Sequence, residues 1–284
     1  MELTRAIIYG LIQGLTEFLP ISSSGHLAIV EAVFKEDAGI AGGDALSFSV
    51  LLHLGTLFAV IAVYRKDIGE LIRSAPGLFL KLIRGRLKFR ELEPCERTLI
   101  CLIISTLPLI PAAMLEDRVA YISTRIVTVG ALLMINAAML FAADRMKSGK
   151  TDGGTLGVKQ ALTVGLSQVF ALLPGLSRSG TTTTVGLSQG FDRDFAVKYS
   201  FLMSIPAVAG ACILDLPDFI GKAAHSGDSK LLAVYFAGAL TAALTGICAI
   251  KLLALAAKRK SFKYFALYCA AVGIAAAVYG AINR

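Results

Sequence analysis

Long runs of apolar residues dominate the chain. Six of them hold between 16 and 27 residues and carry few charges: 46–64, 98–115, 126–143, 199–214, 231–257 and 264–282. An α-helix needs about 17–25 mainly apolar residues to cross the hydrocarbon core of a bilayer. The pattern therefore predicts six transmembrane helices.

Two further apolar segments are interrupted by a polar break. Residues 6–19 and 27–34 flank the sequence PISSSGH, and residues 158–173 and 181–190 flank the sequence PGLSRSG. Proline and glycine interrupt a helix, and each flanking piece is too short to cross a bilayer with ease. Each segment is therefore predicted to be a re-entrant helical hairpin, which leaves the membrane on the side from which it enters.

The two hairpins resemble each other in sequence. A shift of 155 positions aligns residues 9–30 with 164–185, and seven of the 22 positions are identical, including Ser22/Ser177, Ser24/Ser179 and Gly25/Gly180. Three predicted spans follow each hairpin, and an odd number of spans inverts the second copy relative to the first. We therefore predict an all-α polytopic membrane protein with one integral membrane domain, 1–284. Its first repeat, 1–143, holds hairpin 6–34, and its second, 158–284, holds hairpin 158–190.

The basic residues gather on one side of this predicted topology. The chain has 28 Lys and Arg against 20 Asp and Glu, a net charge of +8. Nineteen of the basic residues lie in segments 65–97, 145–159, 193–198 and 258–263, and seven lie in the connections on the other side. Such an excess marks the cytoplasmic side, so the charge reflects orientation and does not indicate nucleic-acid binding. The mouth of the first hairpin is then extracytoplasmic.

The second hairpin carries candidate anion-binding chemistry. Arg178 stands at the break, where an unpaired charge in lipid is unfavourable. Helix N-termini and hydroxyl groups bind anions, and a guanidinium matches phosphate oxygens. We expect a phosphate site that uses Arg178 together with Ser177, Ser179, Gly180 and Thr182. The alternative, a structural ion pair between Arg178 and Glu17, stays open.

The first hairpin carries candidate catalytic groups. Gln13 and Glu17 share one helix face, and Glu17 lies nine residues before His26, so that the two can converge across the break. Ser23 is a candidate nucleophile if a base activates it. Ser22, Ser24 and Gly25 would add phosphate contacts, although serines at such a position also cap helices. Another polar residue, His53, either lines the cavity or bonds a neighbouring helix.

The two broken segments resemble the signature motifs of a known family. QGLTEFLPISSSGH and PGLSRSGTTTT are similar to the motifs of the undecaprenyl-diphosphate phosphatases, which are associated with bacitracin resistance. The similarity extends to FSVLLHLGTLFAV and YSFLMSIP. It implies an enzyme of the cell membrane that removes the terminal phosphate of an isoprenoid diphosphate and regenerates the carrier for cell-wall assembly. It also implies six spans and two re-entrant hairpins.

The resemblance assigns roles to particular residues. The family's motif carboxylates fall on Gln13 and Glu17, its serine on Ser23, its histidine on His26 and its arginine on Arg178. It implies a divalent cation, Mg²⁺ or Ca²⁺, for which Glu17 is a candidate ligand. Many members have Glu where Gln13 stands and Gln where His53 stands, which puts the metal ligands in doubt.

Two other functions compete with this one. A polyprenyl-phosphate transporter or flippase with the same inverted repeats would need only the anion clamp. The second is that of the lipid phosphatases with a histidine nucleophile, which carry another His six residues after the arginine. This chain has Thr184 at that position, so the sequence excludes this function. Attack by Ser23 and attack by water activated by His26 are both compatible with the sequence. The partners implied are the isoprenoid diphosphate and the bilayer, with homodimer formation open.

Overall fold

The chain folds as a bundle of helices. The computed structural model describes residues 3–34, 43–226 and 229–283, and the only extended pairing among these is a single bridge between Thr151 and Phe191. The helices are α1 (Leu3–Phe18), α2 (Ser23–Phe34), α3 (Gly43–Val63), α4 (Arg65–Ile83), α5 (Pro94–Thr106), α6 (Leu109–Ala112), α7 (Glu116–Ser123), α8 (Ile126–Arg145), α9 (Val158–Phe170), α10 (Arg178–Ser188), α11 (Arg193–Ser226), α12 (Ser229–Lys258) and α13 (Phe262–Ile282), with the short 3-10 turns η1 (Phe89–Glu91) and η2 (Ala113–Leu115).

All six long apolar runs form helices. Within the described residues, five helical segments are long and apolar enough to cross a bilayer: Pro94–Ala112, Ile126–Arg145, Arg193–Leu214, Lys230–Lys258 and Phe262–Ile282. Helix α3 meets this criterion only together with α4, from which it is bent by 84°. The prediction of an all-helical, multi-pass membrane protein is confirmed.

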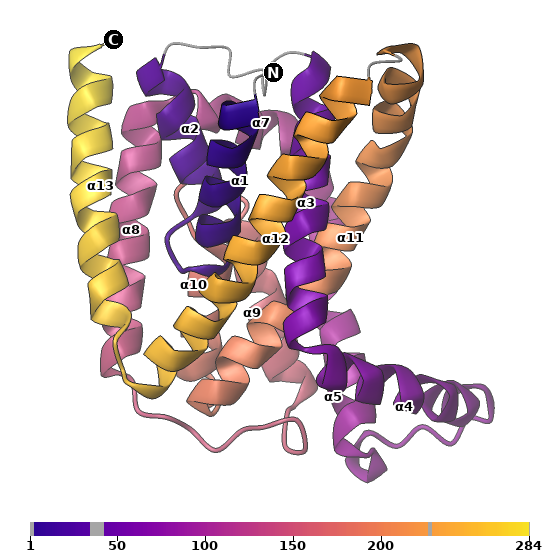
Figure 1. Ribbon diagram of the computed structural model, residues 1–284. Helices are drawn as coiled ribbons and strands as arrows, with labels where there is room; N and C mark the ends of the chain where they lie inside the picture. Colours follow the sequence, from indigo (N-terminus) through magenta and orange to yellow (C-terminus); the bar gives the residue numbers. More distant parts are fainter. Residues whose placement is uncertain (1–2, 35–42, 227–228, 284) are drawn as a thin grey trace.

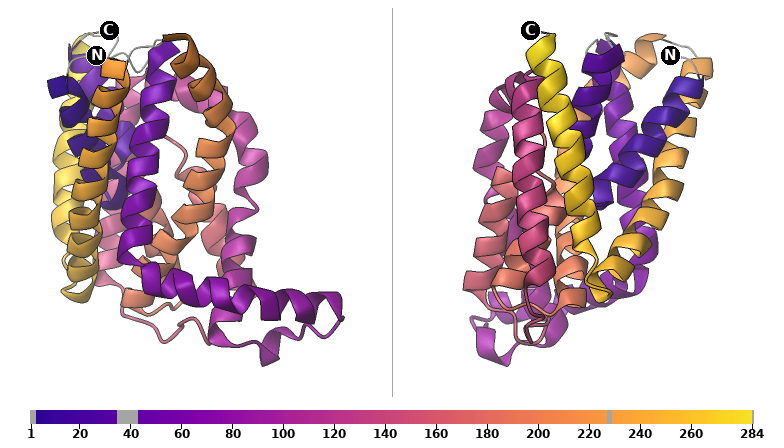
Figure 2. Two further views of the ribbon diagram at one scale, coloured as in Figure 1. Left: turned by 45° about the vertical axis from the view of Figure 1, so that its right-hand side comes forward. Right: turned by 90° about the vertical axis from the view of Figure 1, so that its left-hand side faces the viewer.

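The two broken segments lie at opposite ends of the bundle. Helices α1 and α2 occupy the upper half in Figure 1, and their connection lies near the middle. Helices α9 and α10 occupy the lower half. The long helices α8, α12 and α13 run from one end of the bundle towards the other (Figures 1 and 2). Both breaks therefore reach the interior of the bundle, from opposite ends.

The helices after the breaks begin earlier than the sequence predicts. The sequence predicts the pieces after the breaks at 27–34 and 181–190, but α2 begins at Ser23 and α10 begins at Arg178. The cause is helix capping: Ser22 Oγ accepts a hydrogen bond from the N–H of Gly25, and Ser177 Oγ accepts one from the N–H of Gly180. Ser23 and Arg178 consequently occupy the first turns of their helices.

Small residues bring the helices of the bundle close together. Gly10 and Gly14 of α1 face carbonyl oxygens of α12, and a Cβ at either position would lie only 2.4 Å from the oxygen. Likewise, a Cβ at Gly130 of α8 would lie 2.5 Å from the carbonyl oxygen of Gly273 of α13. In a bilayer, helices associate through such close backbone contacts because lipid is as apolar as the side chains.

Asn136 of α8 joins the two breaks. Its Nδ2 donates to the carbonyl of Pro20 at 2.8 Å, and its Oδ1 accepts from the N–H of Ser177 at 3.2 Å. The side chain is completely buried. Ser22 Oγ strengthens the connection, because it also accepts from the N–H of Gly175 at 3.1 Å.

Replacing this amide is expected to destabilise the protein. Asn136→Leu leaves the carbonyl of Pro20 and the N–H of Ser177 without that partner, which costs about 1–3 kcal/mol for each buried group. We expect thermal unfolding in detergent to begin at a clearly lower temperature than in the wild type. Asn283→Leu, at the exposed end of α13, is the matched control and should unfold like the wild type. Equal unfolding temperatures for both variants would contradict this role of Asn136.

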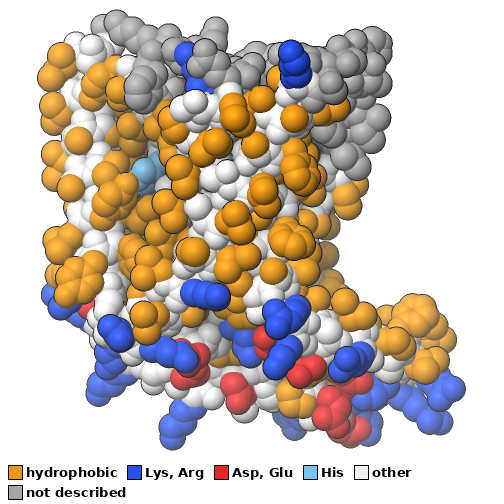
Figure 3. Space-filling model, in the orientation of Figure 1, with side chains coloured by type: hydrophobic (Ala, Val, Ile, Leu, Met, Phe, Trp, Pro, Cys, Tyr) orange, Lys and Arg blue, Asp and Glu red, His pale blue; other side chains and the backbone are white. Residues whose placement is uncertain are grey.

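The basic residues gather at one end of the bundle. Figure 3 shows most of the visible Lys and Arg side chains at the lower end, around α4 and the connections near it, and apolar side chains along the sides of the helices. The sequence assigned these segments to the cytoplasmic side. Of the basic residues assigned to the other side, Lys35 and Arg284 lie outside the described residues.

Candidate active site

A cavity of about 270 Å³ lies where the two breaks meet. Its polar lining comes from both hairpins, and α3, α6 and α11 close it with further side chains. The predicted site residues that line it are Glu17, Ser22, Ser23, Ser24, His53, Ser177 and Arg178. The two broken segments thus bring residues about 155 positions apart in the sequence into one cavity.

Glu17 is the centre of the polar network in this cavity. Its Oε2 accepts a hydrogen bond from Ser23 Oγ at 2.8 Å and another from Gln13 Nε2 at 3.1 Å. Its Oε1 forms an ion pair with Nη2 of Arg178. The side chain of Glu17 is 9% exposed and that of Arg178 is 22% exposed. A hydroxyl group that donates to a buried carboxylate beside a guanidinium is suited to act as a nucleophile.

The ion pair explains how Arg178 is tolerated inside the bundle. Charged groups within a membrane protein usually pair with one another. The alternative that the sequence left open, a pair between Arg178 and Glu17, is therefore present. It does not remove Arg178 from the candidate site, because the guanidinium still lines the cavity and stays partly exposed there.

Several of the side chains predicted to contact phosphate form hydrogen bonds with other groups of the protein. Ser22 and Ser177 cap α2 and α10, so their oxygens already accept backbone N–H groups. Ser179 Oγ lies 3.3 Å from the carbonyl of Leu19. Thr182 Oγ1 contacts the carbonyl of Arg178 at 2.7 Å and Ser200 Oγ at 2.6 Å.

Four of the predicted phosphate contacts do not line the cavity. Ser179, Gly180 and Thr182 follow Arg178 in α10 but are not among the residues around the cavity, because the helix turns them away from it. Gly25 is also absent from the lining. A Cβ at Gly25 would lie 3.0 Å from the Cα of Gly175, so this glycine permits the close approach of the two breaks.

His26 does not converge with Glu17 in this structure. Its Nδ1 lies 2.7 Å from the carbonyl of Ser22, and its Nε2 lies 2.9 Å from the hydroxyl of Tyr268, on whose ring it stacks. His26 instead lines a separate, mainly apolar cavity of about 550 Å³ between α1, α2 and α13. The sequence could not predict this orientation, because the partner on α13 is 242 residues away.

Gln168 is a site residue that the sequence analysis passed over. It lines the cavity, its side chain is buried, and its Nε2 donates to the carbonyl of Ser105 at 2.6 Å. Within the part of the chain that the structure describes, its Oε1 has no hydrogen-bond partner, and neither has Oε1 of Gln13. The signal was present in the repeat, because the shift of 155 residues aligns Gln13 with Gln168.

The side chains around the cavity could bind a metal ion only if the substrate supplied most of the other ligands. No group of three or more His, Cys, Asp and Glu side chains comes together in the described parts of the chain. Among the described residues that line the cavity, Glu17 is the one carboxylate. Mg²⁺ commonly binds one or two protein carboxylates together with substrate phosphates and water. The site therefore fits an ion that arrives with a diphosphate and uses Glu17.

These features define a multi-pass helical membrane protein with a Glu–Ser–Arg cluster between two broken helix pairs. The chain matches the family described as Bacitracin resistance protein BacA over residues 6–275, and it belongs to that family.

Similar proteins are known in archaea and bacteria. The chain is 40% identical over 278 residues to the undecaprenyl-diphosphatase of Methanobrevibacter smithii, with 96% of each chain covered. It is 38% identical over 276 residues to that of Bacteroides fragilis, which covers 96% of this chain and 97% of the relative. It is also 39% identical to that of Korarchaeum cryptofilum, with 97% and 98% covered. The resemblance that the two motifs indicated is confirmed.

Proposed function

We propose that the protein hydrolyses undecaprenyl diphosphate to undecaprenyl phosphate and inorganic phosphate, and so recycles the lipid carrier of cell-wall assembly. Its family and the names of its relatives support this activity. The observation that carries the proposal is the hydrogen bond from Ser23 Oγ to Glu17, in a cavity that Arg178 also lines. An anion clamp alone would not need a hydroxyl group aimed at a buried carboxylate.

The proposed topology has six spans and two re-entrant hairpins in an inverted repeat. Helices α1–α2 and α9–α10 form the hairpins, and the repeats cover residues 1–143 and 158–284 of one membrane domain. In this proposal α3 is the sixth span, and the bend of 84° after it supports a position of α4 along the membrane surface. The excess of basic residues supports a cytoplasmic location for the α4 end and an extracytoplasmic opening for the site in the plasma membrane.

The chain's own groups suffice for a two-step transfer. Glu17 takes the proton of Ser23, and Ser23 Oγ forms a bond to the terminal phosphorus. The bond from that phosphorus to the bridging oxygen breaks, and undecaprenyl phosphate leaves with the bonding electrons. Water then attacks the phosphorus of the phosphoserine, the bond from that phosphorus to Ser23 Oγ breaks, Glu17 returns its proton to Oγ, and inorganic phosphate is released. Arg178 stabilises the negative charge on the transferred group in both steps.

Other parts of the site bind the substrate. A divalent cation, Mg²⁺ or Ca²⁺, held by Glu17 and the diphosphate, would neutralise part of the phosphate charge. Ser24 and the first-turn N–H groups of α2 and α10 other than those of Gly25 and Gly180, which donate to the capping serines, would bind phosphate oxygens. The apolar cavity beside His26 shares Thr16 with the site and provides a lateral route for the isoprenoid tail.

Phosphate release by the purified protein tests this function. The protein in detergent micelles should release inorganic phosphate from undecaprenyl diphosphate, and a Glu17→Gln/Arg178→Ala double variant should not. A carrier that binds the same lipid would retain the diphosphate intact. Absence of phosphate release from folded wild-type protein, with Mg²⁺ or Ca²⁺ supplied, would contradict the proposal.

Glu17 and Gln13 are expected to share one role. Glu17→Gln should lower kcat about 100-fold or more, because an amide keeps the shape but does not accept a proton from Ser23. Gln13→Glu alone should be tolerated, because many members of the family resemble that state. Phosphate release by the single and double variants is the measurement. Recovery of activity by Gln13→Glu in the Glu17→Gln background is the expected result; no recovery would show that position 17 is uniquely placed.

A further inference from the structure

Helix α4 extends sideways from the end of the bundle where basic residues gather (Figures 2 and 3). One face of it is apolar and exposed: Ile72, Phe79, Leu82 and Ile83 are 60–66% exposed. The other face carries Lys and Arg, including Lys66, Arg73 and Lys81. A helix with these two faces lies in the interface of a membrane, with its apolar side in the acyl chains and its basic side towards water.

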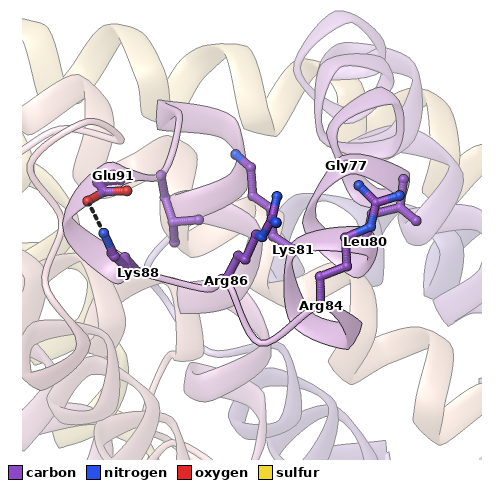
Figure 4. A pocket seen from close by; sticks show the side chains of 8 residues that line it. Gly77, Leu80, Lys81, Arg84, Arg86, Lys88 and Glu91 are labelled. Carbon is purple, nitrogen blue, oxygen red and sulfur yellow. Dashed lines mark hydrogen bonds and ion pairs between the residues drawn. The ribbon is translucent and has the colours of Figure 1, made fainter.

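The end of α4 folds back and gathers further cations. The N–H of Arg86 donates to the carbonyl of Lys81 at 2.9 Å, and Gly85 has a φ of 62°. This is the hydrogen-bond pattern with which helices commonly end when a glycine follows, because only glycine adopts the left-handed conformation without strain. The turn places Arg86 and Lys88, from the connection after α4, beside Lys81 and Arg84 from its last turn (Figure 4).

These four side chains surround a cavity of about 380 Å³. Two of them already have acidic partners: Lys81 Nζ lies 2.6 Å from Glu96, and Lys88 Nζ lies 2.9 Å from Glu91. Among the described residues, no ion pair or side-chain hydrogen bond involves the guanidinium groups of Arg84 and Arg86. The cavity therefore keeps two uncompensated positive charges in groups whose shape matches phosphate oxygens.

We infer that this pocket, formed by Lys81, Arg84, Arg86 and Lys88, binds the phosphate of an acidic phospholipid in the leaflet that contacts α4. The position of the pocket selects a lipid and not a soluble phosphate. The exposed apolar residue Leu80 lines the pocket, and Phe79, Leu82 and Ile83 of the same last turns are exposed as well. A ligand that contacts both the cations and the apolar residues has a phosphate joined to acyl chains. Basic pockets of this kind at the cytoplasmic surface recognise acidic lipid headgroups.

A single tryptophan can report on this pocket. The chain contains no Trp, so Phe79→Trp introduces one fluorophore on the exposed apolar face of α4. The protein is reconstituted in vesicles of phosphatidylcholine that contain equal fractions of either brominated phosphatidylglycerol or brominated phosphatidylcholine. Bromine quenches Trp fluorescence at contact, so the ratio of quenching gives the preference of the site for the acidic headgroup.

The inference predicts a preference for phosphatidylglycerol of about fivefold or more, as expected from uncompensated cations at a membrane surface. The preference should fall to about one when Arg84→Gln and Arg86→Gln are added, because the two unpaired guanidinium groups are lost. Lys147→Gln with Lys150→Gln removes the same charge from an exposed connection at the same end and should leave the preference unchanged. Equal quenching by both lipids in the parent, or an equal loss in the control, would overturn the inference. Neither outcome depends on phosphate release.

Discussion

Ser23→Ala is expected to lower the rate of phosphate release by about 1,000-fold or more, since it removes the group that receives the phosphoryl group. The substitution deletes one hydroxyl, and Ser22 rather than Ser23 provides the cap of α2. The variant should therefore insert, purify and unfold like the wild type. The measurement is kcat for undecaprenyl diphosphate, together with thermal unfolding in the same detergent.

Ser24→Ala is the matched control for this result. Ser24 also lines the cavity, but its hydroxyl makes only a long contact of 3.4 Å with Ser22 Oγ. Its loss should lower kcat by less than about tenfold, the value of one ordinary hydrogen bond. If Ser23→Ala keeps more than a few per cent of wild-type activity, the covalent step at Ser23 is wrong. Attack by water would then replace it.

Arg178→Lys is expected to lower kcat about 100-fold or more, although the positive charge is kept. The guanidinium presents parallel N–H groups to two phosphate oxygens, whereas an ammonium acts as a point charge. Removal of one such transition-state donor typically costs about 100- to 1,000-fold in rate. Arg178→Ala should be inactive, and it should also be less stable because Glu17 loses its cationic partner.

The lysine variant separates catalysis from structure. Lys can still neutralise Glu17, so the unfolding temperature of Arg178→Lys should stay near that of the wild type while kcat falls. Arg259→Lys, at an exposed position at the end of α12, controls for the exchange itself and should keep full activity. Near-normal turnover in Arg178→Lys would show that the arginine acts only as the partner of Glu17.

The sequence predicts the long helices because a helix that crosses a bilayer must be apolar over a fixed minimum length. A helix such as α8 must be apolar over its whole length, so its run of residues is visible without any tertiary information. The breaks are visible because Pro20 and Pro174 are each followed by glycine and several hydroxyl residues, which together interrupt the apolar run. The repeat then predicts that Glu17, Ser23 and Arg178 meet, and they do.

Contacts between distant segments decide what the sequence leaves open. Three serines follow Pro20, and only the structure assigns the cap to Ser22, whose oxygen also receives the N–H of Gly175. His26 turns towards α13 because Tyr268 offers a hydrogen bond and a stacking face there. Helix α4 was not predicted from the sequence. Its many charges indicated a polar connection between two spans and not an amphipathic helix.

The stereochemical course at the terminal phosphorus tests the central claim most directly. Each in-line displacement inverts the configuration at phosphorus, so transfer to Ser23 followed by attack of water gives two inversions. With undecaprenyl diphosphate made chiral at its terminal phosphorus by oxygen isotopes and sulfur, the released thiophosphate should show net retention. Net inversion would mean a single displacement by water and would contradict the account in which Glu17 activates Ser23.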